Sequence, residues 1–162
     1  MELWRRCTNN LRQAILAAHD IAHTQGCAMI EPEHLALGLL DVAACSAVRV
    51  LTQLGVDLTS LRSALFDEAT RYATDRSTPH DSMRMSRRAR RALQLSYIEA
   101  RRHQAHRGDR ASGGARVATV HLLLGLTSPV AELGGAVLRT HGVFHGEIAQ
   151  MIRQVTQAGR GA

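Results

Sequence analysis

Two segments of this chain, 87 residues apart, have nearly the same sequence. Residues 34–42 read His34-Leu-Ala-Leu-Gly-Leu-Leu-Asp-Val, and residues 121–129 read His121-Leu-Leu-Leu-Gly-Leu-Thr-Ser-Pro. In both copies a Gly-Val pair begins 21 residues after the His, at Gly55 and at Gly142, with no gap in between. Because a duplicated sequence folds into a duplicated structural unit, the chain is predicted to contain two copies of one unit.

Periodicity and composition predict that the unit is helical. Hydrophobic residues make up 45% of the 162 residues and aromatic residues only 3%, so the core must be aliphatic. Apolar residues recur at helical spacing, which predicts first-half helices at about 9–24, 32–41, 44–54 and 58–73. The predicted fold is all-α: eight helices in two pseudo-twofold four-helix repeats, packed as a single domain over residues 1–162. The first repeat is expected at about 9–73, a linker at 74–85 and the second repeat at about 86–157.

Local signals mark the ends of several helices. Gly26 is expected to end the first helix, Asp57 to cap the fourth and Ser86 to cap the fifth. The last three helices are predicted at 117–127, 132–141 and 144–157. The first helix repeats at an offset of 78 residues and the His motif at 87, so the second half has nine extra residues between them. They fall in the Gly/Arg-rich segment 103–116, which is predicted to be a mobile loop.

Several functional classes find no support in the sequence. No apolar run approaches the ~20 residues that span a bilayer, and the N-terminus has no apolar signal region, so a cytoplasmic location is expected. Cys7, Cys27 and Cys45 are odd in number without C-x-x-C spacing, which predicts reduced thiols rather than disulfides or zinc. No nucleophile motif is present, so the expectation is a protein without catalysis, metal or cofactor.

The residues around the two His motifs resemble one known family. In the first half they are Glu31-Pro-Glu33-His34-Leu-Ala-Leu-Gly-Leu39 and Val50-Leu-Thr-Gln-Leu-Gly-Val56. In the second half they are Ala118-Thr-Val120-His121-Leu-Leu-Leu-Gly-Leu126 and Val137-Leu-Arg-Thr-His-Gly-Val143. Over about residues 5–157 the chain resembles the Clp N-terminal domain, the repeat domain that precedes the AAA+ modules of bacterial Clp unfoldases.

The resemblance implies a non-catalytic, protein-binding module of the Clp proteolysis system. Such a module could act as an adaptor, sequester substrates or ligands, or regulate a Clp unfoldase, and its partners would be the unfoldase or its substrates. The chain stops where the unfoldase modules would begin, and it has no Lys and therefore no G-x-x-x-x-G-K-[ST] phosphate loop. A free-standing domain that neither binds nor hydrolyses ATP is therefore expected.

The resemblance also implies one candidate ligand site. In some family members each repeat binds phosphoarginine: a motif Glu pairs with the guanidinium, and a Thr at the first helix start helps to hold the phosphate, as their chemistry allows. The matching residues here are Thr8 and Glu33; the second repeat has Ser86 and Val120, and Val cannot accept a guanidinium. One site is therefore expected, not two. The alternative is that Glu33 only stabilises a helix start. His34 and His121 are expected to have structural roles.

Basic residues are concentrated in one segment. All 20 basic residues are Arg, and residues 84–116 hold ten of them against two acids. The segment predicts a broad basic face made of Arg87, Arg88, Arg90, Arg91, Arg101 and Arg102. Its partner could be an acidic protein or nucleic acid; aromatic residues for base stacking are nearly absent, which favours the protein. A basic helical nucleic-acid-binding regulator stays open as the alternative function.

Overall fold

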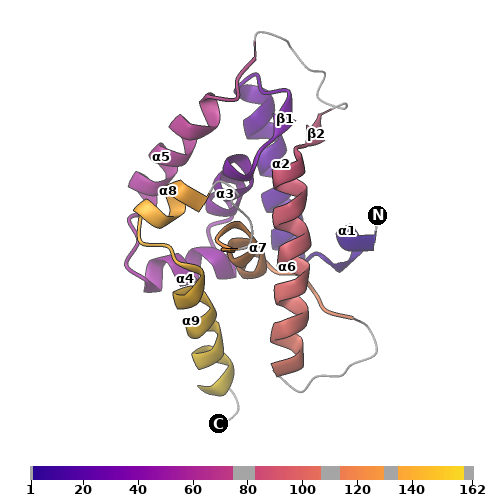
Figure 1. Ribbon diagram of the computed structural model, residues 1–162, viewed down its shortest axis with the longest axis vertical. Helices are drawn as coiled ribbons and strands as arrows, with labels where there is room; N and C mark the ends of the chain where they lie inside the picture. The colour runs from indigo at the N-terminus through magenta and orange to yellow at the C-terminus, as the bar shows by residue number, and fades with distance from the viewer. Residues whose placement is uncertain (1, 75–82, 107–113, 130–134, 159–162) are drawn as a thin grey trace.

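Helices make up nearly all of the regular structure. The computed structural model describes residues 2–74, 83–106, 114–129 and 135–158, and within them it contains nine helices (Figure 1). In chain order these are α1 (Glu2–Arg6), α2 (Asn9–Thr24), α3 (Pro32–Asp41), α4 (Ser46–Gln53), α5 (Leu58–Thr70), α6 (Arg87–His106), α7 (Thr119–Leu126), α8 (Gly135–Thr140) and α9 (His145–Ala158). The described strands are β1 (Met29–Ile30) and β2 (Arg84–Met85). The all-α fold class is confirmed, and the short α1 adds to the eight helices predicted.

Three helices begin at side chains that cap them. The Thr8 hydroxyl accepts a hydrogen bond from the Leu11 amide at 3.3 Å at the start of α2. Asp57 accepts from the second and third amides of α5, and the Ser86 hydroxyl accepts from the Ala89 amide at 3.1 Å at the start of α6. These bonds satisfy amides that have no partner within their own helix, as the sequence predicts at Asp57 and Ser86.

The two motif helices, α3 and α7, form the centre of the molecule. Residues 31–39 and 119–128 are buried without exception, which explains why these helices are apolar on every side. α2 packs along α3, and α6 packs along α7 (Figure 1). A Cβ atom at Gly38 would overlap the Ala14 carbonyl of α2, and one at Gly125 would overlap the Ala92 carbonyl of α6. The motif glycine therefore permits the close approach of each helix pair.

The two halves pair through their backbones at the starts of four helices. β1, which precedes α3, pairs in parallel with β2, which precedes α6, and the Ser86 amide donates to the Ile30 carbonyl at 3.0 Å. The equivalent contact in the other direction is a parallel bridge from Cys7 to Val117, where the Thr8 amide donates to the Val117 carbonyl at 2.9 Å. The start of each His motif therefore lies beside the start of the first helix of the other half.

Several predicted boundaries differ from the structure. α6 continues through His106, so the loop predicted at 103–116 begins later; residues 107–113 lie outside the described part of the chain. The helix predicted to reach residue 73 ends at Thr70. Residues 75–82 of the predicted linker and the start of the helix predicted at 132–141 are also outside the described residues. The division into repeats at 9–73 and 86–157 stays a prediction, which the equivalent contacts support.

Within the described ranges, no single helix is long and apolar enough to cross a membrane. α3 and α4 together pass on length and composition, but they are bent by 89° relative to each other. Since α3 is buried among the other helices, its apolar character is accounted for by the core.

Candidate functional site

The motif histidines fix the helix starts. His34 Nδ1 accepts a hydrogen bond from the Glu31 amide at 2.9 Å, which assigns the ring proton to Nε2; Nε2 in turn donates to Gln25 at 3.0 Å. His121 Nδ1 accepts from the Ala118 amide at 3.0 Å, and its Nε2 lies 3.1 Å from His103. Burial lowers the pKa of both motif histidines to about 4, with the charge of His103 adding to the effect at His121. Both rings are therefore neutral and structural, as predicted.

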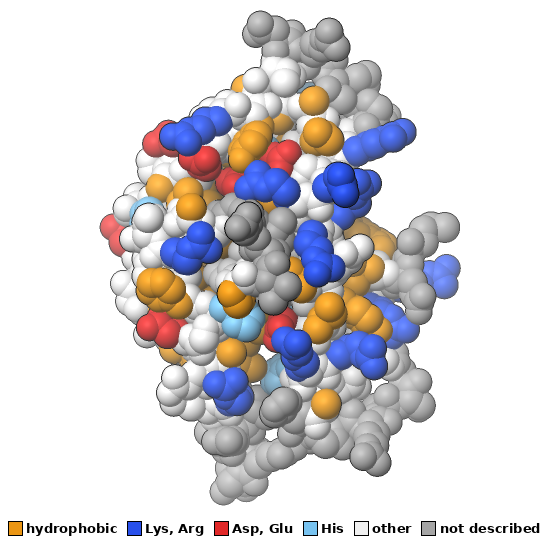
Figure 2. Space-filling view, viewed as in Figure 1, with side chains coloured by type: hydrophobic (Ala, Val, Ile, Leu, Met, Phe, Trp, Pro, Cys, Tyr) orange, Lys and Arg blue, Asp and Glu red, His pale blue; other side chains and the backbone are white. Residues whose placement is uncertain are grey.

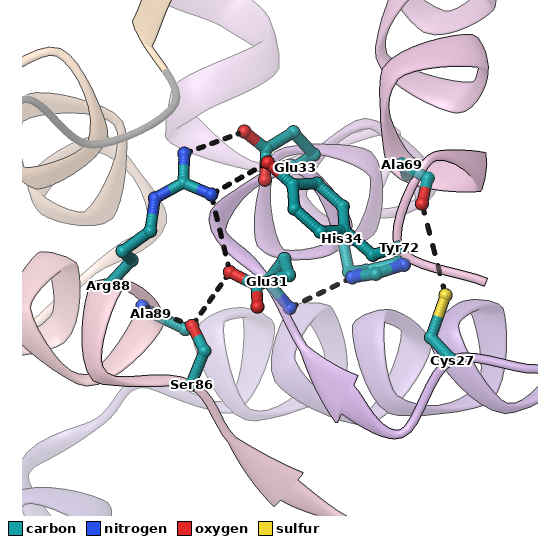
Figure 3. A network of polar contacts seen from close by, with 9 residues as sticks. All are labelled: Cys27, Glu31, Glu33, His34, Ala69, Tyr72, Ser86, Arg88 and Ala89. Carbon is teal, nitrogen blue, oxygen red and sulfur yellow. Dashed lines mark hydrogen bonds and ion pairs between the residues drawn. The ribbon is translucent and has the colours of Figure 1, made fainter. Parts of the chain in front are cut away.

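A charged cluster joins the start of α3 to the start of α6. The Arg88 guanidinium contacts Glu33 Oε1 through Nη2 at 3.2 Å and Glu31 Oε2 through Nη1 at 3.4 Å. Its Nη1 also donates to the Tyr72 hydroxyl at 2.8 Å, and the Ser86 hydroxyl donates to Glu31 Oε2 at 2.8 Å. Figure 3 shows these side chains converging from the two halves of the chain. We refer to Glu31, Glu33, Tyr72, Ser86 and Arg88 as the junction cluster.

Burial governs the electrostatics of the junction cluster. Glu33 is 3% exposed, and its Oε2 atom is buried without a hydrogen-bond partner among the described residues. Burial raises the pKa of the Glu33 carboxyl, and a backbone hydrogen bond and the charge of Arg88 oppose this only in part. Burial lowers the pKa of Arg88, but its bond to Tyr72 and the charges of Glu33 and Glu31 raise it overall. The contact therefore leaves the Glu33 charge less than fully compensated.

The structure does not bring Thr8 and Glu33 together. Thr8 caps the start of α2, whereas His34, next to Glu33, contacts Gln25 just past the end of α2. A helix of 16 residues is about 24 Å long, so the two predicted ligand residues lie near opposite ends of α2. The hydroxyl that lies beside the Glu33 motif is that of Ser86, the predicted degenerate position. The spacing of Thr8 and Glu33 in the sequence does not predict this contact, because the residues at the start of each motif meet residues of the other half.

The second junction lacks all the charges of the first. The residues equivalent to Glu31, Glu33 and Arg88 are Ala118, Val120 and Asn10. There the Val120 amide donates to the Ser46 hydroxyl at 3.3 Å, and the Thr119 hydroxyl lies 2.9 Å from the same oxygen. The two acids and the arginine are thus present together in one junction and replaced together in the other, as expected for side chains that compensate one another.

The predicted basic face is narrower than expected. Arg87, Arg90, Arg91 and Arg101 are exposed on α6, and Arg102 is exposed but pairs with Glu99. Arg88 is turned toward the junction cluster, so it does not belong to this face, which is a correction to the sequence prediction. Figure 2 shows arginine side chains gathered on the side of the molecule that carries α6.

The described residues offer little for metal or nucleophilic chemistry. All three cysteines are buried and unpaired, and burial raises the pKa of the Cys7 and Cys27 thiols. A thiol nucleophile needs a lowered pKa, so these two are poor candidates. In the described ranges no group of three His, Cys, Asp or Glu side chains is placed to hold a metal ion.

A duplicated helical motif with this packing defines a class of interaction domain found on Clp ATPases. The sequence profile of the Clp repeat N-terminal domain matches residues 6–109, so the chain belongs to that family. An uncharacterized protein of Mycobacterium tuberculosis is 32% identical over 140 residues, which cover 86% of this chain and 49% of the relative. The chaperone protein ClpB of Oceanobacillus iheyensis is 26% identical over 163 residues, which cover 98% of this chain and 18% of ClpB. The chain thus spans about half the length of the mycobacterial relative.

Solved structures agree on the fold. The N-terminal domain of Hsp104 from Candida albicans matches with a TM-score of 0.69 and 16% identity, covering 91% of this chain and 89% of that one. The N-terminal domain of the ClpV1 ATPase from an Escherichia coli type VI secretion system matches with a TM-score of 0.69 and 19% identity, covering 96% and 88%. Domains of this family are non-catalytic protein-interaction modules of Clp ATPases.

Proposed function

We propose that this chain is a non-catalytic protein-binding module of the Clp proteolysis system, acting in the cytoplasm on a Clp unfoldase or on the proteins that such an unfoldase handles. The observation that carries the proposal is its membership of the Clp repeat N-terminal domain family, with the fold built around both motif helices. Apart from Glu33, the motif residues are used for packing and capping inside the core. The binding of a protein partner therefore falls to surfaces outside the motif helices.

A degradation assay tests this function directly. Purified Clp unfoldase and its peptidase would degrade fluorescent casein while the chain is titrated into the reaction. An adaptor raises the rate of casein degradation, whereas a sequestering protein or an inhibitor of the unfoldase lowers it. Calorimetry of the chain with the unfoldase and with unfolded casein identifies which of the two it contacts. An unchanged rate together with no heat of binding to either would contradict the proposal.

Phosphoarginine is a second candidate ligand. The Oε2 atom of Glu33 favours it, because this buried atom has no hydrogen-bond partner in the part of the chain that the structure describes. Here the carboxylate already holds the guanidinium of Arg88, so a ligand guanidinium has to displace that side chain before it can bind. Of the two hydroxyls considered from the sequence, that of Ser86 lies in the junction cluster, where it donates to Glu31, and that of Thr8 does not.

Calorimetry with free phosphoarginine tests this second candidate. We expect Arg88→Ala to strengthen binding and Glu33→Gln to abolish it, with free arginine as the control ligand and thermal melting as the check that each variant is folded. Absence of binding to both the native chain and Arg88→Ala would leave Glu33 with a structural role alone.

A further inference from the structure

The outward face of α6 carries a stripe of exposed residues that is basic at both ends. Exposed residues recur along α6 every three or four positions, so they lie on one side of the helix. From Arg87 to Arg102 the stripe is about 22 Å long at the rise of an α-helix. We define the α6 stripe by its arginines and its one large apolar residue: Arg87, Arg90, Arg91, Ile98, Arg101 and Arg102.

Most of its arginines have no acid partner among the residues that the structure describes. The acid next to the stripe is Glu99, which pairs with Arg102 and has a side chain only 12% exposed. No ion pair joins Arg87, Arg90, Arg91 or Arg101 to an acid among the residues that the structure describes. Four like charges held on one helix face repel one another, so an acidic partner would stabilise them.

The first half of the chain shows that the fold does not require this charge. α2 is equivalent to α6 at an offset of 78 residues, and its outward face carries Asn9, Gln13, Leu16, Asp20, His23 and Thr24. Of the stripe arginines, Arg90 alone has an arginine counterpart, Arg12, whose guanidinium donates to the Trp4 and Arg5 carbonyls. The same helix is therefore built without a basic face, and the charge on α6 has to be explained by something outside the fold.

The spacing of the stripe favours a protein partner over a nucleic acid. Its arginines form two groups, Arg87 with Arg90 and Arg91 at one end and Arg101 with Arg102 at the other. Between them lie Gln94 and Ile98, and Ile98 is 40% exposed. A phosphate backbone presents evenly spaced charge and favours an uninterrupted basic row, whereas a protein segment can place acids at both ends and an apolar residue between them.

We propose that the α6 stripe docks an acidic helical segment of a partner protein, with acids opposite the two arginine groups and an apolar side chain on Ile98. The partner segment needs about 15 residues to reach from one arginine group to the other as a helix. The charges set the orientation and the rate of docking, and the contact at Ile98 keeps affinity when salt screens the charges. This surface does not involve the junction cluster and does not depend on which Clp protein the chain serves.

Fluorescence anisotropy with three probes tests the proposal. The first is a labelled helical peptide of about 15 residues with Glu at its two ends and Leu at its centre, matched to the stripe. The second is the same peptide with Gln at the centre, and the third is a short DNA duplex. The protein variants are Arg90→Glu with Arg91→Glu, and Ile98→Ser. The control is Gln13→Glu, which adds negative charge at the position of α2 that is equivalent to Arg91.

We expect the Leu peptide to bind more tightly than the Gln peptide and the duplex at physiological salt. The double charge reversal should weaken its binding at least tenfold and Ile98→Ser about threefold, while Gln13→Glu should change it less than twofold. If the double reversal unfolds the chain, as judged by circular dichroism, Arg90→Gln with Arg91→Gln replaces it. Tighter binding of the duplex, equal binding of both peptides, or no binding of the Leu peptide would each overturn the proposal.

Discussion

At the scale of single residues, the junction cluster shows how a buried acid is tolerated. Glu33 is almost fully buried, and the burial of an isolated carboxylate destabilises a fold unless a partner compensates it. Arg88 supplies that partner from the other half of the chain, while its own side chain remains 35% exposed. The second junction has Ala118, Val120 and Asn10 at the equivalent positions, so the charges are a feature of one junction rather than a requirement of the fold.

The first prediction concerns the removal of Arg88. Arg88→Ala leaves two buried acids uncompensated, and we expect a loss of about 2–3 kcal/mol in the free energy of unfolding. This is less than for a fully buried pair, because water already screens part of the contact. Urea denaturation followed by circular dichroism measures the change.

The matched control for that prediction copies the second junction into the first. The triple variant Glu31→Ala, Glu33→Val and Arg88→Asn removes the charges together, so we expect it to recover most of the loss. A triple variant that is less stable than Arg88→Ala would contradict this expectation. It would show that the three charged side chains stabilise the fold beyond offsetting one another's burial.

At the scale of helices, the motif glycines allow two pairs of helices to pack closely. α3 lies against α2 at Gly38, and α7 lies against α6 at Gly125, so each helix pair meets backbone to backbone. This explains why Gly recurs within a helix in both motifs even though it lowers helix propensity. The sequence shows the repetition of the glycine, and the structure shows what the glycine contacts.

The second prediction tests this close approach with a single methyl group. The Cβ of Gly125→Ala would overlap the Ala92 carbonyl of α6, so the helices must separate, and we expect a destabilisation of at least about 1–3 kcal/mol in thermal or urea unfolding. Gly146→Ala, in α9, is the matched control, because a Cβ there meets nothing within 4 Å. We expect the control to be neutral or slightly stabilising; equal losses in the two variants would refute the packing argument.

At the scale of the whole molecule, both halves depend on a neutral buried histidine. His34 and His121 each cap a central helix, and burial holds the pKa of each at about 4, below the ordinary value of 6.5. The unfolded chain therefore binds protons that the folded chain does not, and stability is complete above about pH 6.5 and falls as the pH approaches 4. Glu33, whose pKa is raised, acts in the opposite direction and offsets part of this loss.

The third prediction follows from that linkage. Lowering the pH from about 7 to about 5 should reduce the free energy of unfolding by about 2 kcal/mol for each of the two histidines. Urea midpoints at the two pH values measure it. His121→Gln should be less stable near pH 7 but should lose less stability on acidification. A stability independent of pH over this range would contradict the assignment of neutral rings.

Local features of this protein could be predicted from the sequence, and contacts between the two halves could not. The helices, the caps at Asp57 and Ser86, and the structural roles of His34 and His121 follow from local patterns, because caps and amphipathic faces depend on neighbours a few residues away. The sequence predicts Arg88 on a basic face, because a run of arginines carries no information about Tyr72, which is 16 residues away. The sequence pairs Thr8 with Glu33, because both belong to the first copy of the repeat.

The sequence by itself determined the duplicated helical unit, its two motifs and the family. Each motif consists of residues that are close along the chain, so it can be recognised without the tertiary structure. The tertiary structure decided which residues share a site. The parallel contacts between β1 and β2 and between Cys7 and Val117 place the start of each motif beside the start of the first helix of the other half. Ser86 and Arg88 rather than Thr8 therefore lie beside the acids of the first motif, and α6 is left with a single outward basic stripe. The physical reason is that side chains from distant parts of the chain meet only when the helices pack. The sequence of a repeat does not show that the start of each copy contacts the start of the first helix in the other copy.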